Sequence, residues 1–133
     1  GKYLTYVNPI PEKGVFLFAR IVAALGERRP DIPVLVVEGR GRADWLRRCG
    51  LNSANTTSVF RMPNTSDPRN FYHVSRLLIM PSVWQESFGR VAVEGMMNGI
   101  PVVASDRGAL PKVIGQGGVC LPIPLHVSSE TRT

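Results

Sequence analysis

The sequence predicts a three-layer α/β domain, in which helices cover both faces of a mainly parallel sheet of about six strands. Three apolar runs, Pro33–Glu38, Leu77–Met80 and Pro101–Ala104, have the length of buried strands. Between the last two runs, apolar residues recur at helical spacing. Strand, helix and strand in this order form a βαβ unit, whose two strands are parallel. A chain of 133 residues is long enough for one such domain with its own core.

The other expected elements continue the same alternation of strands and helices. They are a strand over Tyr3–Val7, a helix opening at Lys13-Gly14, a helix over Ala43–Cys49, a third strand over Thr56–Met62, a helix from Asp67 to about Arg76, a short helix over Pro111–Ile114 and a last strand over Val119–Leu121. Prolines in the turn at 8–11 argue against helix there.

The turn between Met80 and the central helix carries an unusual glycine. We expect Ser87 to be the N-cap of that helix, which places Gly89 in the first turn, where glycine lowers helix stability. A physical reason for glycine there is the close approach of a ligand to the backbone amides of Phe88, Gly89 and Arg90. Unpaired amides at the positive end of a helix dipole form an anion site.

Two carboxylates flank this expected anion site. Glu86 comes just before the helix and Glu94 about two turns into it. Carboxylates accept hydrogen bonds from hydroxyl groups. A phosphate at the amides and hydroxyls at two carboxylates together describe a nucleotide sugar. The alternative, given equal weight on chemistry alone, is an ordinary βαβ unit with two solvated carboxylates.

A resemblance to a known family covers nearly the whole chain. The pattern PSxxxESFGRVAVEGMMNGIPVVAS, with seven residues between Glu86 and Glu94, resembles the donor-site signature of the retaining glycosyltransferases of family four. The segments Pro9–Gly14 (PIPEKG) and Asp106–Pro111 (DRGALP) continue it. Such enzymes have the GT-B fold, two Rossmann-like domains facing each other across a cleft. The resemblance implies that 1–133 is the donor-binding domain, the C-terminal half, without the acceptor domain and the final helices.

The resemblance also implies roles for individual residues. Lys13 contacts the donor diphosphate, and the amides of Phe88 and Gly89 hold the phosphate or the sugar. Glu86, the expected catalytic residue, contacts hydroxyls of the donor sugar, and Glu94 accepts hydrogen bonds from the ribose. The nucleotide sugar is then a substrate, with no cofactor and no metal required. The isolated chain, with half of the cleft missing, is expected to be inactive.

The chain departs from the family pattern at two places. Many members have Gly-Arg in the turn after the first strand, where this chain has Asn8-Pro9, so no arginine can be assigned to the phosphates there. Either Lys13 and the helix amides suffice, or Arg90 or another cation substitutes. Lys112 stands where family members usually have glutamate.

Composition and charge exclude several other classes. The net charge of +6 suits polyphosphates, anionic membranes or nucleic acid, but no nucleic-acid-binding motif is present. Arginine pairs such as Arg28-Arg29 are better explained as helix ends, with a membrane-facing patch as the alternative, since many such enzymes use lipid-linked acceptors. Neither the two cysteines nor the two histidines have metal-ligand spacing. Reduced thiols fit a cytoplasmic protein, and the inner face of the membrane is the alternative location.

Three further classes stay open beside a transferase. A receiver-like or other non-catalytic nucleotide-binding or regulatory module would need an acidic cluster at strand ends, and only Glu38 and Asp106 are candidates. A nicotinamide-dependent dehydrogenase would need G-x-G-x-x-G after the first strand, where Asn8–Pro11 stands instead. An epimerase or phosphorylase with the GT-B fold is the nearest competitor.

Overall fold

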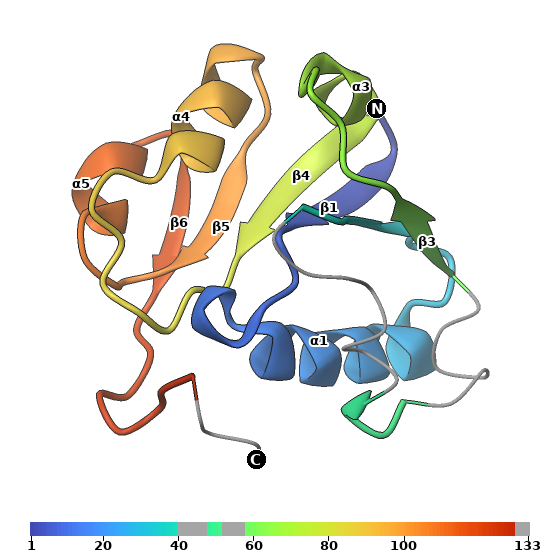
Figure 1. Cartoon of the computed structure of the whole chain (residues 1–133), viewed down its shortest axis with the longest axis horizontal. Coiled ribbons are helices and arrows are strands. Elements are labelled where there is room, and N and C mark those ends of the chain that lie inside the picture. The colour runs from blue at the N-terminus through green and yellow to red at the C-terminus, as the bar shows by residue number, and fades with distance from the viewer. Residues whose placement is uncertain (40–47, 52–57, 130–133) are drawn as a thin grey trace.

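Six parallel strands form the sheet of this computed structural model, which describes residues 1–39, 48–51 and 58–129 (Figure 1). The strands are β1 (Tyr3–Val7), β2 (Val34–Val37), β3 (Val59–Met62), β4 (Ser75–Met80), β5 (Val102–Ser105) and β6 (Gly118–Leu121). Their order in the sheet is β3-β2-β1-β4-β5-β6. In the pairing of β1 with β2, Tyr6 lies beside Val36. All six strands are parallel, which confirms the predicted sheet.

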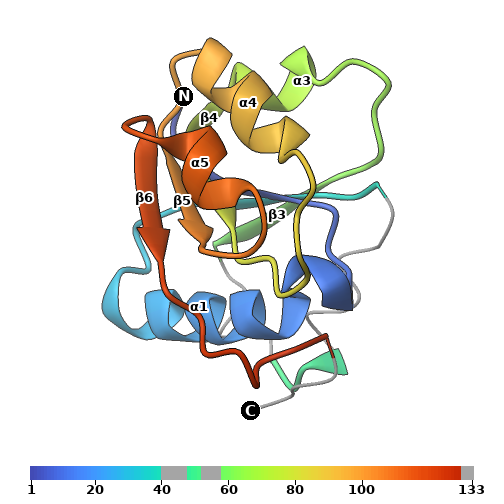
Figure 2. The same cartoon turned by 90° about the vertical axis from the view of Figure 1, so that its left-hand side faces the viewer.

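Helices cover both faces of the sheet. Helix α1 (Val15–Arg28), preceded by a short 3₁₀ turn η1 (Pro11–Lys13), lies on one face, and α3 (Arg69–Tyr72), α4 (Arg90–Met97) and α5 (Leu110–Ile114) lie on the other (Figure 2). The Rossmann-like three-layer prediction is therefore confirmed. The helix expected over Ala43–Cys49 falls largely outside the described residues.

Alternation along the strands builds one apolar core on each face. Tyr6 packs against α1, where its ring stacks on Phe18 with centroids 4.1 Å apart. In β4, Ile79 joins the α1 side, whereas Leu78 and Met80 join the core under α4 and α5. Both faces of the central strands are buried, which explains why they read as continuous apolar runs in the sequence.

The connections leave the sheet in opposite directions at its middle. From β1 the chain proceeds to β2 and β3 on one side, and from β4 it proceeds to β5 and β6 on the other. The carboxyl ends of β1 and β4 are therefore neighbours at a topological switch point, the place where open α/β sheets bind ligands. The turn after β1 and the loop after β4 meet there, and the Val83 amide donates to the Glu12 carbonyl at 3.1 Å.

The predicted helix from Asp67 to Arg76 is wrong at its C-terminal end. Helix α3 ends at Tyr72, and β4 already begins at Ser75. The Ser75 hydroxyl is hydrogen-bonded to the Thr5 hydroxyl at 2.6 Å and also donates to a carbonyl of α3, so Ser75 is fixed in the sheet. Tertiary pairing overrides the helical pattern in this segment. Phe71 and Tyr72 of α3 are buried in the core.

Three further observations concern the cysteines, metal sites and membrane-spanning helices. Cys49 and Cys120 are both free thiols. Within 1–39, 48–51 and 58–129, no three histidine, cysteine, aspartate or glutamate side chains lie close enough together to hold a metal ion. None of the helices in these ranges has the length and apolar character needed to cross a membrane.

Candidate functional site

A glycine brings the two segments together at the switch point. Gly14 has φ of 82°, and a Cβ atom there would lie 1.8 Å from the carbonyl oxygen of Pro81. A side chain at this position would separate η1 from the loop after β4. Gly14 thereby holds its neighbour Lys13 beside the loop that carries Glu86.

Lys13 and Glu86, two of the predicted site residues, form an ion pair although 73 residues separate them. The Lys13 ammonium donates to Oε1 of Glu86, and their side chains are only 17% and 6% exposed. The Tyr6 hydroxyl donates to the Lys13 carbonyl at 2.9 Å, which fixes the backbone of the lysine against β1. The pair is thus a built feature of the fold rather than a surface contact.

Two further donors reach the same carboxylate. Trp84 Nε1 donates to Glu86 Oε1 at 2.6 Å, and the Ser82 hydroxyl donates to that oxygen at 3.2 Å. Burial by itself would raise the pKa of Glu86, but hydrogen bonds from Lys13, Trp84 and Ser82 outweigh it and leave the pKa below its ordinary value. Glu86 is therefore a charged acceptor at neutral pH.

Sequence reasoning missed Trp84 and Ser82. Both residues lie inside the family signature. The signature leaves the position of Trp84 unspecified, and Ser82 was interpreted only as a residue that ends the strand. The Lys13 ammonium also lies 4.9 Å from the centroid of the Trp84 ring, within cation–π range. The only hint in the sequence of a hydrogen bond to Glu86 is that Trp84, which has an indole N–H donor, stands two residues before it.

The helix after the loop begins later than predicted. Its N-cap is Gly89, in the left-handed conformation with φ of 75°, and not Ser87. Glycine is needed at this position for its left-handed backbone conformation. The sequence pattern instead predicted Gly89 inside the first helical turn, explained by the close approach of a ligand. In the described part of the chain, the amides of Phe88 and Gly89 have no hydrogen-bond acceptor, as the predicted anion site requires. The Phe88 side chain is exposed.

Glu94 lies one turn into α4 rather than two, because the helix starts at Arg90. Its Oε2 accepts a hydrogen bond from the Tyr72 hydroxyl at 3.3 Å, and its Oε1 lies 3.9 Å from Arg90 Nε. Burial and the nearby Glu94 charge raise the pKa of Tyr72. Glu94 therefore contacts α3 and α4, and Arg90, named as a substitute cation for phosphate, is directed at Glu94.

The turn after β5 is hydrogen-bonded to the site loop, the segment 81–89 between β4 and α4 that carries Glu86. The Ala109 amide donates to the Glu86 carbonyl at 2.7 Å, and the Gly108 amide donates to Gln85 Oε1 at 2.8 Å. The buried Arg107 guanidinium donates to the carbonyls of Val83, Pro124 and Val127. The Arg107 side chain thus connects the turn after β5 both to the site loop and to the segment after β6.

Asn8, where the family pattern has glycine, adopts the left-handed conformation itself, with φ of 63°. Asparagine tolerates this region better than other residues with side chains. Its Oδ1 lies against Gly39, where a Cβ atom would approach it to 2.2 Å. Asn8 therefore makes a left-handed turn after β1. Beside it, a small cavity of about 20 Å³ is lined by Tyr6, Lys13 and Ser82 among others.

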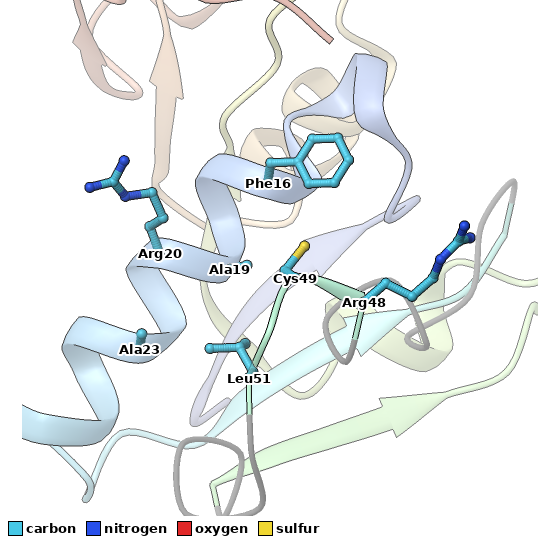
Figure 3. A pocket seen from close by; sticks show the side chains of 7 residues that line it. All are labelled: Phe16, Ala19, Arg20, Ala23, Arg48, Cys49 and Leu51. Carbon is cyan, nitrogen blue, oxygen red and sulfur yellow. The ribbon is translucent and has the colours of Figure 1, made fainter. Parts of the chain in front are cut away.

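A larger cavity lies away from this site. Its volume is about 440 Å³, and it lies between α1 and residues 48–51 (Figure 3). Phe16, Ala19 and Leu51 line it together with two arginines, Arg20 and Arg48, whose guanidinium groups point to opposite sides (Figure 3). None of the predicted site residues lines this cavity, so the convergence of polar groups, and not volume, identifies the candidate site.

Comparison with known proteins gives a consistent family. A family described as glycosyl transferases group 1 matches residues 1–127. The phosphatidyl-myo-inositol mannosyltransferase of Mycolicibacterium smegmatis is 30% identical over 115 residues, 86% of this chain and 30% of the relative. The D-inositol 3-phosphate glycosyltransferase of Corynebacterium aurimucosum is 31% identical over 138 residues, 97% of this chain and 32% of the relative.

A solved structure agrees at the level of the fold. The pneumococcal O-GlcNAc transferase GtfA, in complex with UDP and GlcNAc, superposes with a TM-score of 0.75 at 19% identity, over 97% of this chain and 26% of that one. The chain spans about a third of the length of the curated relatives it matches. The family match extends over almost the whole chain and supports a glycosyltransferase domain over a receiver, dehydrogenase or other module. The chain therefore belongs to the group 1 glycosyl transferases.

Proposed function

We propose that this chain is the donor-binding domain of a retaining glycosyltransferase of family four, the C-terminal half of a two-domain GT-B enzyme. The observation that carries the proposal is the Lys13–Glu86 ion pair at the switch point of the sheet. In this pair, the residue expected to bind the diphosphate lies beside the residue expected to bind the sugar. The amides of Phe88 and Gly89, which have no acceptor among the residues that the structure describes, follow on the same loop.

In this proposal, the donor diphosphate binds to the Lys13 ammonium and to the amides of Phe88 and Gly89. A lysine and free amides at a helix start are donors suited to phosphate oxygens. Glu86, held ionised, accepts hydrogen bonds from hydroxyls of the donor sugar. Glu94, with one oxygen near Arg90 and the other on Tyr72, accepts from the ribose hydroxyls.

The reaction exchanges one bond at the anomeric carbon of the sugar. The bond to the diphosphate oxygen breaks, a bond to an acceptor oxygen forms, and the anomeric configuration is retained. Negative charge grows on the departing diphosphate, and Lys13 and the amides lie ready to stabilise it. Positioning and electrostatic stabilisation supply the catalysis, and no metal is assigned.

The relatives support a nucleotide-sugar donor and guide the choice of probe. The GtfA structure contains UDP and GlcNAc, so UDP is the first nucleotide to test. The name of the mycobacterial relative includes a phosphatidyl-inositol acceptor, which fits the net charge of +6 and supports membrane contact by the whole enzyme at the cytoplasmic face. In this proposal, the binding site for the acceptor lies in the N-terminal domain, so this chain alone should transfer no sugar.

The test is an NMR titration of this chain with UDP, GDP and ADP, followed by the corresponding nucleotide sugars. One nucleotide should shift the resonances of Lys13, Phe88, Gly89 and Glu94. Lys13→Met should weaken its binding at least tenfold, whereas Lys112→Met in α5, a matched lysine outside the proposed site, should not. Shifts that avoid these residues, or no response to any nucleotide from a folded sample, would refute donor binding by this chain.

A further inference from the structure

Three donors converge on a single oxygen of Glu86. Lys13, Trp84 and Ser82 all donate to Oε1. In the part of the chain that the structure describes, Oε2 accepts no hydrogen bond. One half of the carboxylate is thus saturated, while the other half retains its acceptor capacity.

The proposed function makes conflicting demands on this arrangement. Lys13 is the charged partner of Glu86, yet it is also the cation assigned to the donor diphosphate. When Lys13 turns to phosphate, Glu86 loses its ion pair while an anion arrives nearby. A buried carboxylate without compensating donors would take up a proton or move. Of the three donors, the two neutral ones, Trp84 and Ser82, then remain on the carboxylate.

We propose that Trp84 is a positioning residue, whose indole N–H holds Oε1 of Glu86 while Lys13 exchanges that carboxylate for the diphosphate of the donor. The inference rests on the proposed function and adds a residue to it. Oε2 then stays available for a hydroxyl of the donor sugar throughout the exchange.

The geometry favours Trp84 over Ser82 as the principal support. Its hydrogen bond is 2.6 Å long, against 3.2 Å for that of Ser82. The Trp84 ring also lies beside the Lys13 ammonium, so one side chain touches both partners of the exchange. Trp84 is 40% exposed, and its role is therefore not that of a core residue.

The first test measures Glu86 directly and needs no donor. The carboxyl resonance of Glu86 is titrated by carbon-13 NMR in the parent chain, in Trp84→Phe and in Phe60→Leu. Trp84→Phe retains an aromatic ring beside Lys13 but removes the N–H, and it should raise the pKa of Glu86. Phe60 is an exposed aromatic residue on β3, and its replacement should leave that pKa unchanged. An unchanged pKa in Trp84→Phe would overturn the inference.

The second test separates the sugar from the nucleotide. Affinities for UDP and for UDP-GlcNAc are measured by calorimetry. The affinity for UDP-GlcNAc divided by that for UDP reports the contribution of the sugar. Trp84→Phe should lower that ratio about tenfold, the typical effect of removing a hydrogen bond to a charged group, with little change for UDP. Glu86→Gln should lower the ratio similarly, and the double variant should add little further. Equal losses for UDP and UDP-GlcNAc would mean a general loss of structure and would overturn the positioning role.

Failure of the proposed function has a different signature. A folded chain that binds none of UDP, GDP and ADP, nor the corresponding nucleotide sugars, would refute donor binding. In that case, the titration of Glu86 alone would still decide whether Trp84 holds the carboxylate.

Discussion

Gly108 lies directly against the backbone of Glu86. A Cβ atom at Gly108 would approach the Glu86 carbonyl oxygen to 2.2 Å and its amide nitrogen to 2.4 Å. Gly108 also has φ of 58°, a conformation that favours glycine. The turn after β5 therefore helps to fix the position of the residue assigned to the donor sugar, from the far end of the βαβ unit.

Gly108→Ala should displace the Glu86 loop and lower the free energy of unfolding by about 2–4 kcal/mol, from backbone strain and overpacking together. Urea unfolding followed by circular dichroism measures the loss. The matched control is Gly99→Ala, since Gly99 has φ of 75° but open space where its Cβ would lie. Gly99→Ala should cost only the strain, about 1 kcal/mol. Equal costs for the two variants would show that the contact with Glu86 is unimportant.

The ionised state of Glu86 predicts a specific pH dependence of stability. Its folded pKa lies below the ordinary value of 4.5, so its contribution is complete above that value and is lost as the pH falls through the folded pKa. Glu86→Gln should flatten the curve of unfolding free energy against pH in this acidic range. Glu27→Gln, at an exposed carboxylate on α1, should leave the curve as in the parent chain. A slope below pH 4.5 that is as steep in Glu86→Gln as in the parent chain would contradict the assignment.

The sequence predicted most of the fold because its strands are buried on both faces. Runs such as Leu77–Met80 have little alternative to a central parallel strand. The prediction failed where tertiary contacts decide a boundary. Ser75 has a hydroxyl that bonds across to Thr5, and no local pattern indicates this partner. Gly89 was recognised as anomalous but placed inside the helix, because its left-handed conformation is a property of the folded backbone.

The candidate site was predictable in composition but not in its internal contacts. Lys13 and Glu86 each stood out through the family pattern, yet nothing in the sequence indicates that they pair across 73 residues. The part played by Trp84 depends on the direction of its indole N–H, which is set by the loop conformation. Pairing of this kind follows from the meeting of β1 and β4 at the switch point, a feature of topology rather than of local sequence.

Arg107 should be essential to the stability of the site loop. The side chain is 5% exposed and donates to the carbonyls of Val83, Pro124 and Val127, the last two at 2.7 and 2.9 Å. Arg107→Met should leave these carbonyls without their donor and lower the free energy of unfolding by about 2–3 kcal/mol. Arg20→Met, at an exposed arginine of α1, should change it by less than about 0.5 kcal/mol.

Arg107→Lys should fail to restore the parent stability, because an ammonium group cannot reproduce the planar fork of the guanidinium. Urea unfolding of all three variants provides the comparison. If Arg107→Lys were as stable as the parent chain, the charge alone and not the pattern of donors would hold the loop.

Glu94 should distinguish the nucleoside from the phosphates. Its carboxylate accepts a hydrogen bond from Tyr72. In the proposed function it binds ribose hydroxyls, so we expect it to contribute nothing to diphosphate binding. Glu94→Gln should weaken UDP binding about tenfold, the cost of replacing a charged hydrogen-bond acceptor by a neutral one, and leave inorganic pyrophosphate unaffected. Lys13→Met should weaken both ligands. Calorimetry with the two ligands on the two variants gives four affinities, and a loss of pyrophosphate binding in Glu94→Gln would mean that Glu94 acts through the fold of α4 and not through the ribose.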